Sequence, residues 1–168
     1  ICHRAYRIAD LPQHLEPGLN ERAVYVPRAP TFPNGCHCAE VEIDSETGHV
    51  DVVRYTVVDD VGTVLNPLLL TGQIHGGIVQ GIGQILMEQI VYDDDTGQLI
   101  TGSFMDYCMP RASDLPFFSV HSNPVPTPVN PLGVKGAGEA GTVGALPALM
   151  NAIFSALSPL GIREVNMP

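Results

Sequence analysis

One carboxylate lies inside a glycine-rich segment, Lys135–Gly141, which reads KGAGEAG and comes directly before an apolar stretch. Glycines let a ligand approach the main chain closely, and a carboxylate held beside that ligand can act as a general base. An acidic residue near a helix start also has a purely structural explanation, because it complements the helix dipole. From the residues alone, Glu139 is either catalytic or structural, and Lys135 is either a surface charge or an anion contact.

Two other patterns in the sequence suggest chemistry but lack the context that it requires. Residues Gly136–Gly141 match G-x-G-x-x-G, yet a dinucleotide-binding unit needs a buried strand immediately before this motif. The preceding residues 124–131 contain four prolines, which a central strand does not tolerate. Cys36, His37 and Cys38 have a one-residue spacing and no second pair, unlike a structural zinc site. We therefore predict neither a nicotinamide site nor a metal site formed by these residues.

Two helices are expected to position the chemical groups. The first covers about 72–88 with Thr71 as its N-cap, and it carries five glycines within twelve residues. Each glycine costs about 1 kcal/mol relative to alanine in a helix interior, so something must compensate. Either this helix packs tightly against a neighbouring backbone, or a ligand lies against its first turns and is held by glutamine amides. The second helix covers about 142–158.

Strands and an extended arm complete the expected fold. Alternating and β-branched residues predict a hairpin of 39–44 with 50–58, and a second hairpin of 88–92 with 98–101. A short strand is expected at 117–121. We therefore predict an α+β fold, with antiparallel hairpins packed against two main helices that are each entered through a glycine-rich segment. Residues 1–37 are expected to form an extended peripheral arm, and residues 38–168 a domain.

The composition narrows the classes of partner. Eighteen acidic against eight basic residues give a net charge of -10, which argues against nucleic acid or an anionic membrane surface. We expect no membrane span, since no apolar run reaches the required length of roughly 18 residues. Four scattered cysteines favour a reducing, cytoplasmic setting over a disulfide framework. The absence of a starting methionine and the abrupt end suggest a fragment of a longer polypeptide.

Several motifs together resemble one enzyme family. They occur in that family's order over about residues 38–168 and comprise DDxGxxxNP at 59–67, GQxxGGxxQGxG at 72–83, DYxxP at 106–110, KGxGEAG at 135–141, and Asn151-Ala152. This set resembles the C-terminal part of the molybdopterin-binding large subunit of the xanthine dehydrogenase/aldehyde oxidase family, the molybdenum hydroxylases. Large subunits of the carbon-monoxide-dehydrogenase type are the most similar.

The resemblance implies a molybdenum-dependent oxidoreductase in which Glu139 is the active-site base beside a molybdenum centre. The small carbon substrate would be carbon monoxide, an aldehyde or an N-heterocycle. It implies a molybdopterin cytosine dinucleotide in the complete enzyme, and FAD and [2Fe-2S] clusters on partner subunits or domains. No residue of this chain is expected to be a metal ligand. The implied cofactor-binding residues are Gln73, Gly76, Gly77, Gln80, Gly136 and Gly138.

The resemblance also implies that the chain works with the remainder of a large subunit, because other cofactor loops of the family lie upstream. By itself the chain is expected to hold no molybdenum and to have no activity. An alternative hypothesis is a non-catalytic domain that serves packing or assembly only.

Overall fold

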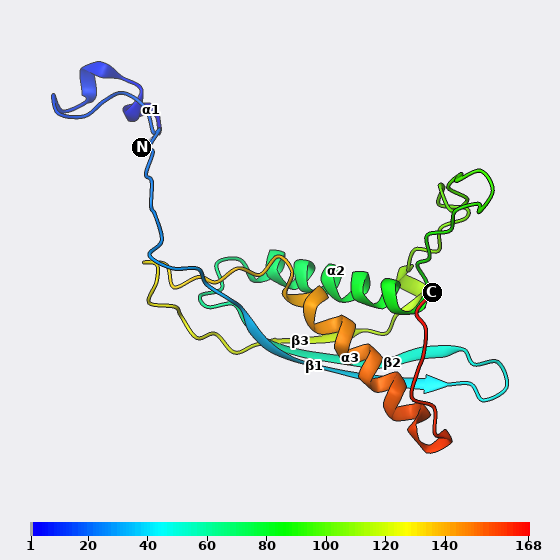
Figure 1. The fold of residues 1–168 in the computed structure, drawn as a ribbon. Coiled ribbons are helices and arrows are strands. Elements are labelled where there is room, and N and C mark those ends of the chain that lie inside the picture. The colour runs from blue at the N-terminus through cyan, green and yellow to red at the C-terminus, as the bar shows by residue number, and fades with distance from the viewer. Residues whose placement is uncertain (1) are drawn as a thin grey trace.

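A three-stranded sheet with the order β1-β2-β3 carries two long helices in the computed structural model, which describes residues 2–168 (Figure 1). Strand β1 (Asn34–Ile43) pairs antiparallel with β2 (Val50–Asp60), so the predicted hairpin is confirmed and is longer at both outer ends. In the connecting turn, the Asp44 carboxylate accepts hydrogen bonds from the N–H groups of Glu46 and Thr47. These two donors hold the pKa of Asp44 below its usual value.

The sheet is mixed rather than built from antiparallel hairpins alone. Strand β3 (Phe118–Ser122) forms close to its predicted position but pairs parallel with β2. The predicted second hairpin is reduced to a single bridge between Tyr92 and Leu99 around a tight turn. The segment that contains this bridge projects beyond the end of α2 in Figure 1, away from any strand that could extend the pairing. The α+β class is therefore confirmed, and the purely antiparallel arrangement is wrong.

Helix α2 (Pro67–Leu86) begins five residues before its predicted start. Thr71 is not the N-cap; instead the Asn66 side chain accepts a hydrogen bond from the N–H of Leu69 at 3.1 Å. Pro67 occupies the first helical position, where its fixed φ suits the helix and its missing N–H is not needed. The glycine-rich stretch therefore lies within α2 instead of leading into it.

Helix α3 (Ala140–Leu157) begins immediately after Glu139 and contains Pro147. Residues Ala140–Leu160 are long and apolar enough to cross a membrane by length and composition alone. Ala145, Leu149 and Ile153 pack into the core of this fold, although only 17% of that apolar stretch is buried, so α3 contributes one face to the core. Both helices pack on one face of the sheet, where the fully buried side chains include Tyr55, Val57, Ile74, Ile78, Ile82 and Leu149.

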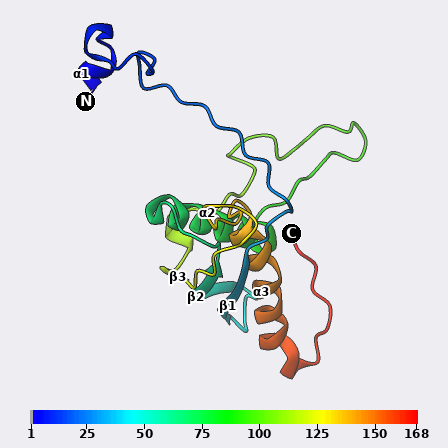
Figure 2. The ribbon, with the colours of Figure 1, turned by 90° about the vertical axis from the view of Figure 1, so that its left-hand side faces the viewer.

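The remaining elements are short. Near the N-terminus, α1 (Cys2–Ala5) and η1 (Ile8–Asp10) lie far from the sheet, and an extended stretch connects them to β1 (Figures 1 and 2). The Tyr25 hydroxyl fastens this stretch to the body by donating to the Val129 carbonyl oxygen at 2.8 Å. Single 3-10 turns follow at η2 (Ala112–Asp114) and η3 (Ser158–Leu160).

Candidate active site around Glu139

Glycines allow α2 and α3 to meet backbone to backbone just after Glu139. A Cβ atom on Gly77 would lie 2.8 Å from the Thr142 nitrogen, and one on Gly81 would lie 2.6 Å from the Ala145 Cβ. From the other helix, a Cβ on Gly141 would lie 2.6 Å from the Ile74 carbonyl oxygen. Tight helix packing therefore explains Gly77, Gly81 and Gly141.

Packing does not explain every glycine of α2. Around Gly72 and Gly76 no described atom would lie within 4 Å of an added Cβ, and both residues are exposed. Gln73 and Gln80 are exposed on the same helix. The middle of α2 therefore presents a surface with two amide side chains and little side-chain bulk, which suits a large polar ligand that lies against the main chain.

The two glutamines contact the segment around Glu139. The Gln73 Nε2 group donates a hydrogen bond to the Gly138 carbonyl oxygen at 2.7 Å. The Thr142 hydroxyl donates to Gln80 Oε1 at 3.2 Å. The structure thus brings the two glycine-rich segments together, because the two glutamines contact Gly138 and Thr142, which lie on either side of Glu139 in the sequence.

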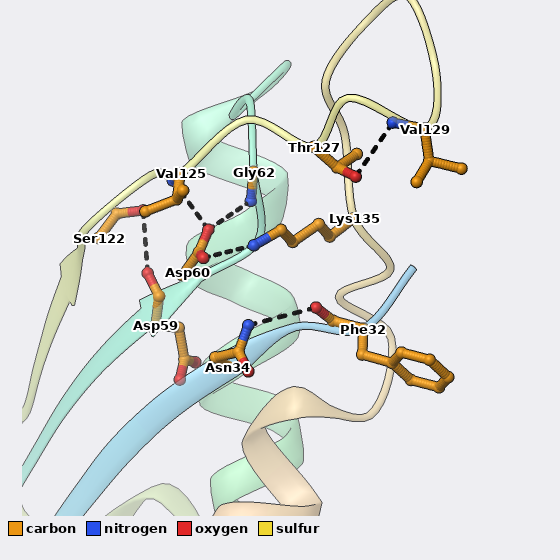
Figure 3. A network of polar contacts seen from close by, with 10 residues as sticks. All are labelled: Phe32, Asn34, Asp59, Asp60, Gly62, Ser122, Val125, Thr127, Val129 and Lys135. Carbon is orange, nitrogen blue, oxygen red and sulfur yellow. Dashed lines mark hydrogen bonds and ion pairs between the residues drawn. The ribbon is translucent and has the colours of Figure 1, made fainter. Parts of the chain in front are cut away.

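Lys135 anchors the chain four residues before Glu139. Its Nζ donates to the Asp60 carboxylate at 2.5 Å, and both side chains are largely buried (Figure 3). The same carboxylate accepts the N–H groups of Gly62 and Val125. The Lys135 hydrogen bond, followed by these two, lowers the pKa of Asp60 to about 2. Lys135 is therefore an ion-pair anchor, rather than the surface charge or anion contact expected from sequence.

Glu139 occupies the N-cap position of α3, but its side chain makes no capping hydrogen bond and is exposed. It lines a cavity of about 530 Å³ together with Gly136 and Gly138. His37 and Asp59, which come from the sheet, line the same cavity. A carboxylate that is free of local partners and faces a cavity is available to accept a proton from a bound molecule.

Sequence reasoning missed a buried polar group in this cavity. His37 and Asp59 have side chains only 5% and 3% exposed, and His37 Nε2 lies 3.5 Å from Asp59 Oδ1. His37 Nδ1 lies 2.8 Å from the Tyr55 hydroxyl. Burial, and secondarily the Asp59 charge, raises the pKa of Tyr55. The signal was available in the alternation of β1 and β2, which points all three side chains to one face.

The exposed polar groups near Glu139 are suited to an organic cofactor. Across residues 2–168, no three His, Cys, Asp or Glu side chains are grouped closely enough to bind a metal. Cys36 and Cys38 are free and exposed. The exposed amides of Gln73 and Gln80, beside the uncovered backbone at Gly76, match a ligand rich in hydrogen-bonding groups.

Comparisons with known proteins show which proteins this chain resembles. The family model described as a molybdopterin cofactor-binding domain matches residues 1–116. The chain is 43% identical over 157 residues to the nicotine 6-hydroxylase large subunit of Paenarthrobacter nicotinovorans. It is 36% identical over 157 residues to the carbon monoxide dehydrogenase large chain of Hydrogenophaga pseudoflava. In both cases 94% of this chain and 19% of the relative are covered, so the chain spans about a fifth of their length.

Solved structures show the same fold. A Cu,Mo-CO dehydrogenase superposes with a TM-score of 0.85 at 34% identity, covering 99% of this chain and 21% of that one. Quinoline 2-oxidoreductase from Pseudomonas putida 86 gives 0.83 at 39% identity, covering 96% and 20%.

Proposed function

Because this chain belongs to the molybdopterin cofactor-binding domain family, we propose that it supplies the active-site base, Glu139, of a molybdenum-dependent oxidoreductase. The observation that carries the proposal is the hydrogen bond from Gln73 to the Gly138 carbonyl oxygen. It joins the open surface of α2 to the turn that presents Glu139, so one bound cofactor can touch both. When bound, the molybdenum cofactor supplies the two-electron oxidation chemistry.

The residues of this chain have separate roles in the proposal. The Glu139 carboxylate accepts a proton within the cavity that it lines. Gln73 and Gln80 orient the pterin dinucleotide through their amides, and Gly76 lets it lie against the α2 backbone. Gly136 and Gly138 keep the approach to the metal free of side chains. We assign Gly77 to the packing of α2 on α3 instead of to cofactor contact, because it is buried against Thr142.

The complete enzyme requires more than this chain, which spans only about a fifth of its curated relatives. We propose that the sheet and the two long helices form one domain of a large subunit, which begins at Asn34, the start of β1, instead of the expected residue 38, and that the residues before Asn34 reach another part of the subunit. FAD and [2Fe-2S] clusters on partner subunits or domains would carry electrons away, in the cytoplasm. Relatives are named for nicotine, carbon monoxide and quinoline, so we infer a small carbon substrate.

A chimeric enzyme tests the proposal directly. In it, this chain replaces the matching segment of the nicotine 6-hydroxylase large subunit, and nicotine turnover and molybdenum content are measured. Glu139→Gln keeps the shape of the side chain but removes its basicity, so we expect turnover to fall at least ~100-fold at unchanged molybdenum content. Glu42→Gln changes an exposed acid of β1 and serves as the matched control, with no loss expected.

The alternative of a packing or assembly domain predicts a different result. If Glu139→Gln turns over nicotine as fast as the unchanged chimera, the assignment of Glu139 as base is wrong and the alternative is favoured. For the isolated chain we expect no molybdenum by metal analysis and no hydroxylation. Stoichiometric molybdenum in the isolated chain would contradict the need for the rest of the subunit.

A further inference from the structure

The strand register gathers His37, Tyr55 and Asp59 on one side of the sheet. His37 on β1 is the cross-strand partner of Val57 on β2. Tyr55 and Asp59 lie two residues on either side of Val57, so they share its face and are the diagonal neighbours of His37. The imidazole therefore lies between a hydroxyl and a carboxylate by virtue of the backbone pairing alone.

Hydrogen bonding fixes the orientation of the imidazole ring. In the tautomer that carries its proton on Nε2, Nδ1 accepts the Tyr55 hydroxyl proton at 2.8 Å and Nε2–H points toward Asp59 Oδ1 at 3.5 Å. The His37 and Tyr55 rings also meet edge to face with centroids 5.8 Å apart. Asp59 is 2% exposed, and its Oδ2 has no hydrogen-bond partner within the described residues. Burying a carboxylate oxygen without a hydrogen-bond partner costs free energy, and an apolar residue would pack the core without this cost.

Two glycines leave room for these side chains, one beside Asp59 and the other beside His37. A Cβ atom on Gly35 would overlap the Asp59 carboxylate, and one on Gly144 would overlap the His37 imidazole. Gly144 lies in α3, five residues after Glu139. The imidazole is therefore in direct contact with the α3 backbone just beyond the helix start, where a side chain on the helix would have displaced it.

We propose that His37, held by Tyr55 and Asp59, is a positioning residue for Glu139. Its ring supports α3 at Gly144 and lines the same cavity as Glu139, and thereby fixes the start of the helix that presents the carboxylate. This inference rests on the proposed function of Glu139. Its structural half, the support of the α3 start, is independent of the cofactor.

Hydrogen exchange on this chain tests the structural half. His37→Phe keeps a ring but loses both polar contacts, so the amide of Val143, which donates to the Glu139 carbonyl oxygen at 3.0 Å, should exchange at least 10-fold faster. The Leu70 amide at the start of α2 should be unchanged. Cys38→Ala alters an exposed neighbour on the other face of β1 and is the control. Unchanged Val143 exchange, or a uniform increase at both amides, would contradict positioning.

A size-compensation experiment separates support by the ring from simple loss of stability. Gly144→Ala alone should speed Val143 exchange, because its methyl group displaces the imidazole. In a His37→Ala background the same Gly144→Ala change should slow exchange, because the methyl group fills the space that the ring has left. If Gly144→Ala has the same effect in both backgrounds, the imidazole does not support α3 and the proposal is wrong.

Kinetics of the chimeric enzyme test the functional half of the proposal, that His37 positions Glu139 for turnover. His37→Phe should lower kcat at least 10-fold, with KM and molybdenum content unchanged, and His37→Asn, which keeps an acceptor for Tyr55, should restore part of kcat. Full kcat in His37→Phe, while Glu139→Gln is inactive, refutes positioning and leaves the base assignment intact. Full turnover in Glu139→Gln refutes the base assignment itself, whatever His37→Phe does to exchange at Val143.

Discussion

Alanine substitutions at two adjacent glycines of α2 should give variants of different stability, because only one of the two new methyl groups meets another helix. In a helix interior, alanine is favoured over glycine by about 1 kcal/mol. At Gly76 no described atom lies within 4 Å of the added Cβ, so Gly76→Ala should raise the free energy of unfolding by about 1 kcal/mol. The gain comes from the backbone alone, because the new methyl group contacts nothing.

At Gly77 the same methyl group meets the main chain of α3. It would lie 2.8 Å from the Thr142 nitrogen and 3.0 Å from the Gly141 Cα, and backbone atoms of a packed helix cannot rotate away. Overpacking of this kind costs about 1–3 kcal/mol. The helix propensity gain is common to both sites, so Gly77→Ala should be about 1–3 kcal/mol less stable than Gly76→Ala.

Chemical denaturation of the two variants measures this difference. Both should unfold with the same m-value, and only the midpoints should separate. Gly72→Ala is a second open site on α2 and should behave like Gly76→Ala. Equal stability of the Gly76→Ala and Gly77→Ala variants would mean that α2 and α3 are not in backbone contact.

The two open sites, Gly76 and Gly72, distinguish an effect on stability from an effect on function. In the chimeric enzyme, Gly76→Ala should lower molybdenum content although it stabilises the fold, because its methyl group occupies the surface proposed for the cofactor. Gly72→Ala lies outside the proposed contact set and should leave molybdenum content unchanged. If Gly76→Ala retains full molybdenum, Gly76 is not a cofactor contact.

Two further predictions concern the anchors of the site. Asp60 has a pKa lowered to about 2 by Lys135 and two backbone N–H groups, so its stabilising effect is present above about pH 4 and is lost as the pH falls toward 2. Asp60→Asn should therefore be less stable than the parent at pH 7, and the two proteins should converge in acid denaturation below about pH 3; a constant gap would contradict this. Asn66→Ala removes the N-cap acceptor for Leu69 and should lower the free energy of unfolding by about 1 kcal/mol in urea, whereas Asn66→Ser should restore most of it.

Local patterns predicted the elements well where one face is buried. The hairpin of β1 and β2 followed from the period-two alternation, and both long helices followed from their apolar spacing. The start of α2 was misplaced because Thr71 was chosen as the N-cap, and the signal five residues earlier, at Asn66-Pro67, was not used. This dipeptide is an N-cap followed by proline at the first helical position.

Non-local pairing was beyond the reach of sequence patterns. The strand at Phe118–Ser122 was expected, but its parallel register with β2 depends on how α2 and the long following segment return the chain. Tyr92 and Leu99 form a bridge without a longer ladder, since no third strand or core covers them. Alternation there satisfied the local criterion without a buried face to stabilise it.

In the candidate site, too, local features could be predicted from the sequence and long-range contacts could not. Glu139 and the glutamines could be selected from their residue types and from the family resemblance, and the structure brings the two segments together. Lys135 was misjudged because its partner Asp60 is 75 residues away in the sequence. His37 and Asp59 were passed over, since only the register of two strands reveals that they meet.

The turn that carries Glu139 is held at closely spaced points along the chain: Lys135 on Asp60, Gly138 on Gln73, and Gly141 against Ile74. Such a segment has few alternative conformations left to lose when a partner molecule arrives. The binding free energy of that molecule is then not consumed in ordering the peptide. A preorganised main chain of this kind suits a base that must act at one fixed place over many reaction cycles.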